Sequence, residues 1–161
     1  MPMSEDSDSS AEPYRITIED ETGSLSDTVL AKVRSVVDTV LRRWNVPRAE
    51  LEYRFVDDAT IWEINRRFLG HDYPTDVISF PLEDGDSLEG SIVISVDTAR
   101  TQAEAFGTSP EIELLLYAAH GTLHLVGLED ARQEDRSRMR QAEREVLRSV
   151  GIELPESHDD T

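Results

Sequence analysis

Residues 120–130 read His120-Gly-Thr-Leu-His124-Leu-Val-Gly127-Leu-Glu-Asp130. On a helix, residues four apart lie on one face with Cβ atoms roughly 6 Å apart, so His120 and His124 could bind one metal ion. Gly127 can adopt the left-handed backbone that turns a chain sharply, which places Asp130 to fold back as a third ligand. Two imidazoles and one carboxylate leave the fourth position of a tetrahedral Zn²⁺ for water, as in catalytic zinc sites. The sequence therefore predicts one Zn²⁺ per chain, held by His120, His124 and Asp130.

Other residues compete for these roles. Two histidines four apart often lie on a surface or in a core without binding metal, and Glu129, beside Asp130, is a rival third ligand. His71 and His158 have no partner at a useful spacing, so we expect neither to bind the metal. The chain has no cysteine, which excludes disulfides, iron–sulfur clusters, thiolate zinc sites and a cysteine nucleophile.

Helix signals surround this run. Ser109 followed by Pro110 predicts a helix start, and Gly127 predicts its end. The buried stripe expected on this helix consists of Ile112, Leu115, Leu116, Ala119 and Leu123. A final helix is expected over about 134–150.

Upstream of this run, the sequence predicts strands and further helices. Alternating apolar residues predict strands at 14–18 and 51–55, and short apolar runs predict strands at 77–80 and 92–95. The dipeptide Asp84-Gly85 favours an antiparallel hairpin between the last two. Helices are expected from a cap at Ser26 or Asp27 to about Trp44, from Asp57 to Gly70, and from Asp97 to Gly107. This order predicts an α+β fold, a small mixed four-stranded sheet packed with about five helices.

The charge distribution limits both the domain boundaries and the partners. The chain has 16 basic and 34 acidic residues, a net charge of −18. Residues 1–12 and 153–161 are acidic, and we expect both to be disordered tails flanking a single domain over 13–152. The acidic balance argues against loose electrostatic binding to nucleic acid or to an anionic membrane, but it does not exclude a local basic cleft. We expect neither DNA nor a membrane as a partner. With no apolar run at the N-terminus and none long enough to span a bilayer, the sequence predicts a cytoplasmic protein.

The run from His120 to Asp130 resembles two families of metalloenzymes. Its ligand spacing is similar to that of the metzincin proteases, so the helix that carries the histidines is expected to be a zincin-like metal-binding helix. Those proteases place a general-base glutamate directly after the first histidine, where this chain has Gly121, which argues against a protease of that mechanism.

The second resemblance is more extensive. Residues 120–127 match the signature of the YbeY family of bacterial metal-dependent endoribonucleases, and residues 65–81 are similar to its helix–loop–strand segment. Weaker matches lie at 90–95, at Gln102-Ala103, and at Met139, Glu143 and Leu147, so the resemblance covers about 14–151. It implies a single-strand-specific endoribonuclease that acts in rRNA maturation and ribosome quality control through a zinc-activated water. The implied partners are ribosomal RNA and the small ribosomal subunit or its proteins.

Three departures from the family pattern concern the site. The third ligand of the family is histidine, whereas this chain has Asp130; a carboxylate is a legitimate zinc ligand. The family's cleft arginine is replaced by Leu69, and its Gly-Asp-Ile reads Gly90-Ser91-Ile92. Catalytic residues other than the metal ligands are therefore unassigned. The alternative function is a ribosome-assembly factor whose metal is mainly structural and which has little or no nuclease activity.

Overall fold

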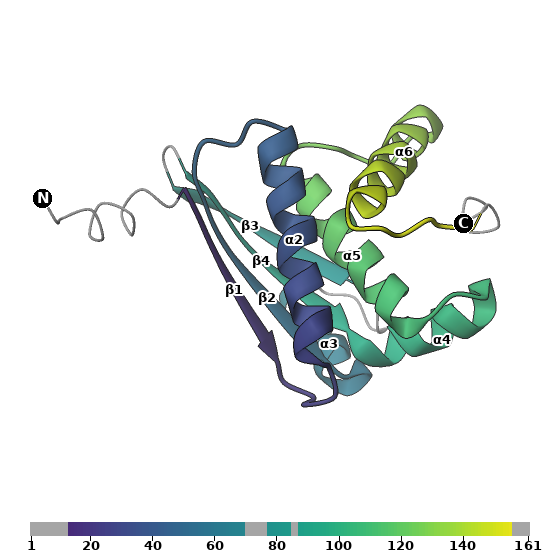
Figure 1. Cartoon of the computed structure of the whole chain (residues 1–161). Helices are drawn as coiled ribbons and strands as arrows, with labels where there is room; N and C mark the ends of the chain where they lie inside the picture. Colours follow the sequence, from purple (N-terminus) through teal and green to yellow (C-terminus); the bar gives the residue numbers. More distant parts are fainter. Residues whose placement is uncertain (1–12, 70–76, 85–86, 156–161) are drawn as a thin grey trace, which may run out of the picture.

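A computed structural model describes residues 13–69, 77–84 and 87–155 (Figure 1). The predicted α+β fold with a small sheet is confirmed. The strands are β1 (Tyr14–Asp20), β2 (Ala49–Val56), β3 (Val77–Asp84) and β4 (Ser87–Ser95). The helices of this part of the chain are α2 (Asp27–Arg43), α3 (Asp58–Ile64), α4 (Val96–Phe106), α5 (Pro110–Leu125) and α6 (Gln133–Ser149), and a π-helical turn, Asn65–Leu69, continues α3.

The sheet has the strand order β1-β2-β4-β3, and three of its strands run parallel. Only β3 is antiparallel, and it pairs with β4 from Val77 opposite Ile94 to Asp84 opposite Ser87. The predicted hairpin is therefore present, with its tip at 85–86 outside the described residues. Both strands are longer than the predicted 77–80 and 92–95, because backbone pairing continues through the polar residues near the tip.

Helix α5 is the central helix of the domain. Figure 1 shows α2, α5 and α6 on one side of the sheet, and α5 contacts α2, α4, α6 and strands β3 and β4. The prediction of a single buried stripe is too narrow, because Leu114, Tyr117, Ala118 and Thr122 are buried as well. A helix surrounded by other elements on most sides buries residues all round.

A buried hydrogen bond ties this helix to the sheet. The Tyr53 hydroxyl of β2 and the Thr122 hydroxyl of α5 lie 2.6 Å apart, and the Thr122 hydroxyl donates to the Ala118 carbonyl at 2.7 Å. Because the Thr122 proton is used in that bond, Tyr53 is the donor to Thr122. Burial raises the pKa of the Tyr53 hydroxyl well above its usual range, so it stays protonated as that donor.

Side-chain caps explain where most helices begin. Ser109 accepts from the Ile112 N–H at 3.2 Å, Ser26 from the Val29 N–H at 3.2 Å, and Asp57 from the Thr60 N–H at 2.8 Å. The predicted cap at Asp97 is wrong. Helix α4 follows β4 directly, and Ser95 caps it by accepting from the Thr98 N–H at 3.0 Å.

The described fold extends past the domain end predicted at residue 152. Leu154 belongs to the hydrophobic core, and Arg144 of α6 donates to the carbonyls of Leu154 and Pro155 at 2.9 and 3.0 Å. These contacts attach the segment after α6 to the domain. None of the helices in the described ranges is long and apolar enough to cross a membrane.

Candidate metal centre

The last turns of α5 present both predicted histidines on one face. His120 and His124 are half-buried, and their rings meet edge to face with centroids 4.6 Å apart and planes at 84°. Their Nε2 atoms are 3.1 Å apart. Because α5 is packed on most sides, these two nitrogens are held on a rigid element.

A tight turn after α5 brings in the carboxylate. The Leu128 N–H donates to the Leu123 carbonyl at 3.0 Å, and Gly127 between helix and turn has a φ of 114°. Few residues other than glycine adopt this backbone conformation without strain. The turn places Asp130 Oδ2 3.4 Å from Nε2 of His120 and 3.4 Å from Nε2 of His124.

His120, His124 and Asp130 therefore form a cluster that could hold a metal ion, with their donor atoms within 4.8 Å of one another. The rival Glu129 is exposed and is not part of the cluster found among the described residues. His71 and His158 lie outside the described residues. Leu69 ends the π-helical turn, but its side chain is outside the described part of the chain.

The spacing of the three atoms fits a tetrahedral ion. For ligand bonds of about 2.0–2.1 Å, the edges of a tetrahedron are about 3.3–3.4 Å long. The observed separations are 3.1, 3.4 and 3.4 Å. The fit holds for a small cation such as Zn²⁺, although the same atoms could hold other divalent ions.

The hydrogen bonds behind the histidines favour the same conclusion. The Nδ1 of His124 lies 3.0 Å from the Leu128 carbonyl oxygen, which can only accept, so this nitrogen carries the proton. The Nδ1 of His120 lies 2.5 Å from Oε2 of Glu143. In the neutral rings both Nε2 atoms then carry lone pairs, and they face each other and a carboxylate oxygen. Three electron-rich atoms this close repel unless a cation or a shared proton lies between them.

Glu143 contacts the cluster, although the sequence alone assigned it no role. It lies on α6 and is only 8% exposed, and its contact with His120 is the carboxylate–histidine arrangement seen behind metal ligands. Its place in the sequence carries a signal, because Met139, Ala142 and Val146 of the same helix face are buried. An acidic residue within an apolar helix stripe requires a buried polar partner.

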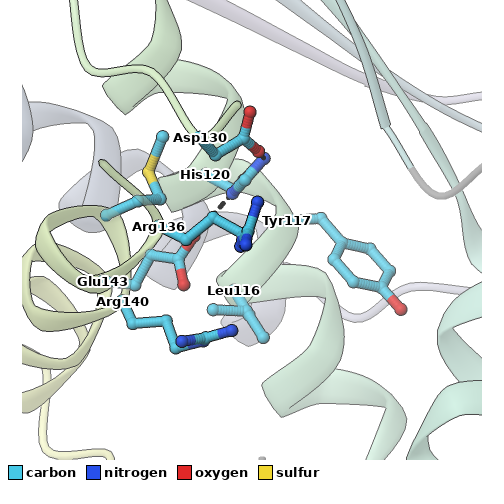
Figure 2. Close-up of a pocket in the computed structure, with 8 residues that line it drawn as sticks. Leu116, Tyr117, His120, Asp130, Arg136, Arg140 and Glu143 are labelled. Atoms are coloured by element: carbon cyan, nitrogen blue, oxygen red, sulfur yellow. Dashed lines mark hydrogen bonds and ion pairs between the residues drawn. The ribbon is translucent and has the colours of Figure 1, made fainter. Parts of the chain in front are cut away.

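A cavity of about 260 Å³ opens beside the cluster. Its walls include His120, Asp130 and Glu143, together with Tyr117 of α5 and Arg136 and Arg140 of α6. In Figure 2 the His120 side chain lies between Asp130 and Glu143, with the dashed line marking its contact to Glu143. The cluster thus has an open side that a small ligand could reach.

Other residues singled out near the family motifs form ordinary hydrogen bonds and ion pairs with neighbouring side chains. Ser91 of β4 donates to Glu52 of β2 at 3.3 Å. Arg66, near Leu69 in sequence, lies over the Trp62 ring and pairs with Glu63 at 2.9 Å. Ser95 is buried, and its hydroxyl donates to Asp58 at 2.5 Å while it accepts from the Thr98 N–H at the start of α4.

The family model and the named relatives that match this chain carry the same family name. The model of the family described as endoribonuclease YbeY matches residues 15–151. A relative from Rhodopirellula baltica named endoribonuclease YbeY is 51% identical over 116 residues, which span 70% of this chain and 60% of that relative. A relative of the same name from Bacteroides thetaiotaomicron is 36% identical over 132 residues, or 82% of this chain and 96% of that relative.

The fold has a solved counterpart. A solution structure of a Thermotoga maritima protein matches with a TM-score of 0.61 and 28% identity, covering 84% of this chain and 93% of that one. The relatives' names confirm, at the level of the family, the expected class of enzyme, a hydrolase that acts on RNA. The chain belongs to the endoribonuclease YbeY family.

Proposed function

We propose that this chain is a zinc-dependent endoribonuclease that cleaves single-stranded RNA and acts in the cytoplasm on ribosomal RNA during maturation and quality control. Membership of the endoribonuclease YbeY family supports the reaction class. The metal ligands in this proposal are His120, His124 and Asp130. The ribosomal setting rests on the resemblance of the sequence to that family.

One observation carries the catalytic assignment. Three donor atoms converge at 3.1–3.4 Å, and two of the three residues, His120 and Asp130, line an open cavity. Structural zinc sites are closed by four protein ligands, whereas catalytic sites have three and leave one position free. The cluster found among the described residues has three members, which supports catalysis over a purely structural metal.

The chain's own residues then have separate tasks. Zinc, when bound, supplies a Lewis acid that polarises a phosphoryl oxygen and lowers the pKa of water. Glu143 and the Leu128 carbonyl fix which nitrogen of each histidine faces Asp130. Asp130 gives the site one more negative charge than a neutral third histidine would, so we expect a bound water to be less acidic than in a three-histidine site.

The test is cleavage of an end-labelled single-stranded RNA by the full chain. We compare protein as purified, protein stripped with a chelator, stripped protein resupplied with Zn²⁺, and the His124→Ala variant. The proposal predicts cleavage that disappears on stripping, is restored by zinc and is reduced at least tenfold in His124→Ala. Glu129→Ala, which changes an exposed neighbour of the cluster, should cleave like the wild type.

Two outcomes would count against the proposal. Unchanged cleavage by protein stripped of its metal would show that the reaction does not require a metal ion. Metal retention without cleavage, together with binding to small-subunit ribosomal proteins, would support the alternative of an assembly factor with a mainly structural metal.

A further inference from the structure

Two arginines of α6 line the cavity beside the metal cluster. Arg136 and Arg140 are four residues apart, so they lie on the same face of the helix. Both contribute to the cavity wall that also contains His120, Asp130 and Glu143. In Figure 2 the two side chains reach from α6 toward α5, where Leu116 and Tyr117 form the facing wall.

The charge of this cavity differs from that of the whole chain. The protein carries a net charge of −18, which repels a polyanion. Within the cavity, the carboxylates of Asp130 and Glu143 together balance one divalent cation. The side chains of Arg136 and Arg140 line the same cavity, so its wall also contains two basic residues.

Arg136 is held in place by a neutral group. Its Nη1 donates to the Ala131 carbonyl at 3.0 Å, next to the ligand candidate Asp130, and its side chain is exposed. No carboxylate in the described ranges forms an ion pair with Arg136. Its charge is therefore available to an anion that enters the cavity.

We propose that Arg136 and Arg140 bind a backbone phosphate of the RNA and thereby position the strand at the metal. The guanidinium fork matches two oxygens of a phosphate, and its charge is permanent. This inference rests on the proposed function, because it assumes that RNA occupies the cavity. It also explains how an acidic protein admits a phosphodiester, which is by a local pair of cations rather than by an extended basic surface.

The test measures RNA binding rather than activity. The full chain with its metal is titrated, in an anisotropy experiment at several salt concentrations, against a fluorescently labelled single-stranded RNA whose phosphorothioate linkages keep the backbone charge but resist cleavage. A gel shows that this probe stays intact. The variants are Arg136→Gln, Arg140→Gln, their combination, and the charge-preserving pair Arg136→Lys with Arg140→Lys. Arg138→Gln is the matched control, because Arg138 is exposed on the same helix and does not line the cavity.

Each single glutamine substitution should weaken RNA binding about five- to tenfold, and the combination should weaken it more. The slope of log K against log salt should become shallower by about 0.7 for each phosphate that the variant no longer neutralises. Arg138→Gln should change neither quantity. The lysine pair should keep most of the salt slope while its affinity falls in part, because lysine keeps the charge but not the fork.

The failure of this inference is distinguishable from failure of the proposed function. If the wild type cleaves RNA, but the double glutamine variant binds it with unchanged affinity and salt slope, the arginine subsite is refuted and the nuclease assignment stands. Equal weakening of binding in Arg138→Gln and in the cavity variants would also refute it. If the wild type neither binds nor cleaves RNA, the proposed function fails and this inference fails with it. Thermal melts and metal content of each variant show that the fold and cluster are intact.

Discussion

The contact between Glu143 and His120 joins two helices at the metal centre. Glu143 lies on α6, and its carboxylate contacts Nδ1 of the half-buried His120 on α5 at 2.5 Å. A carboxylate behind a ligating imidazole orients the ring and raises the basicity of the nitrogen that faces the metal. In the proposed metal site, Glu143 is a positioning residue that acts on the metal through His120.

This role predicts the effect of Glu143→Gln. Glutamine has nearly the same shape but no charge, so metal affinity should fall about ten- to a hundredfold while the fold persists. Affinity is measured by competition with a zinc-binding dye. Glu145→Gln is the control, since Glu145 lies on the same helix and pairs with Arg43 at 3.4 Å away from the site. An unchanged affinity in Glu143→Gln would contradict the positioning role.

At the scale of elements, the turn from α5 to Asp130 links helix geometry to the metal cluster. Gly127 has a φ of 114°, and Gly151, which follows α6, has a φ of 86°. A Cβ added at either position would have no neighbour within 4 Å. A substitution at these sites therefore acts through backbone conformation and not through a steric clash.

These two glycines form a matched pair of tests. Gly127→Ala and Gly151→Ala should each lower the free energy of unfolding by about 1–3 kcal/mol, because alanine is strained at positive φ. Only Gly127→Ala should also weaken metal binding, since only that turn carries Asp130. Chemical denaturation and dye competition measure the two effects. Equal metal affinity in the two variants would show that the turn does not set the position of Asp130.

Local signals in the sequence predicted some elements and missed others for physical reasons. Ser109 with Pro110 predicted the start of α5 correctly, and Gly127 predicted its end to within two residues. Both signals are local, because caps act within one turn of the helix end. The cap of α4 was misplaced, because the end of β4 depends on pairing with distant strands.

In the candidate site, too, features set by local sequence could be predicted, whereas features set by packing between helices could not. The proximity of His120, His124 and Asp130 follows from helix periodicity and one turn, so it could be predicted. The contacts of Glu143, Arg136 and Arg140 with the site depend on how α6 packs against α5, which no local pattern encodes.

At the scale of the molecule, the excess of acidic residues opposes folding at neutral pH. The net charge is −18, and the ion pairs are mostly between exposed side chains, such as Arg42 with Asp38 and Arg148 with Glu153. Exposed pairs contribute little to stability, whereas like charges repel over the whole surface. Salt screens both effects, and at a net charge of −18 we expect the repulsion to be the larger one.

Added salt should therefore stabilise the protein. Between about 0.05 and about 0.5 M NaCl the Debye length falls from roughly 14 to roughly 4 Å, which removes most of the repulsion. We expect Tm to rise by about 2–4 °C in a thermal melt followed by circular dichroism. KCl at the same ionic strength should give the same rise, which excludes a specific effect of sodium. A Tm that falls with salt would mean that attractive ion pairs dominate.

The central claim is that His120, His124 and Asp130 bind one metal ion. The most direct test is metal content by plasma mass spectrometry, on protein purified without chelators or a histidine tag, for the wild type, Asp130→Ala and Glu129→Ala. We predict about one zinc per chain in the wild type and in Glu129→Ala, and little in Asp130→Ala, because Asp130 and not Glu129 belongs to the cluster. No stoichiometric metal in the wild type, or loss of metal with Glu129 rather than Asp130, would contradict it.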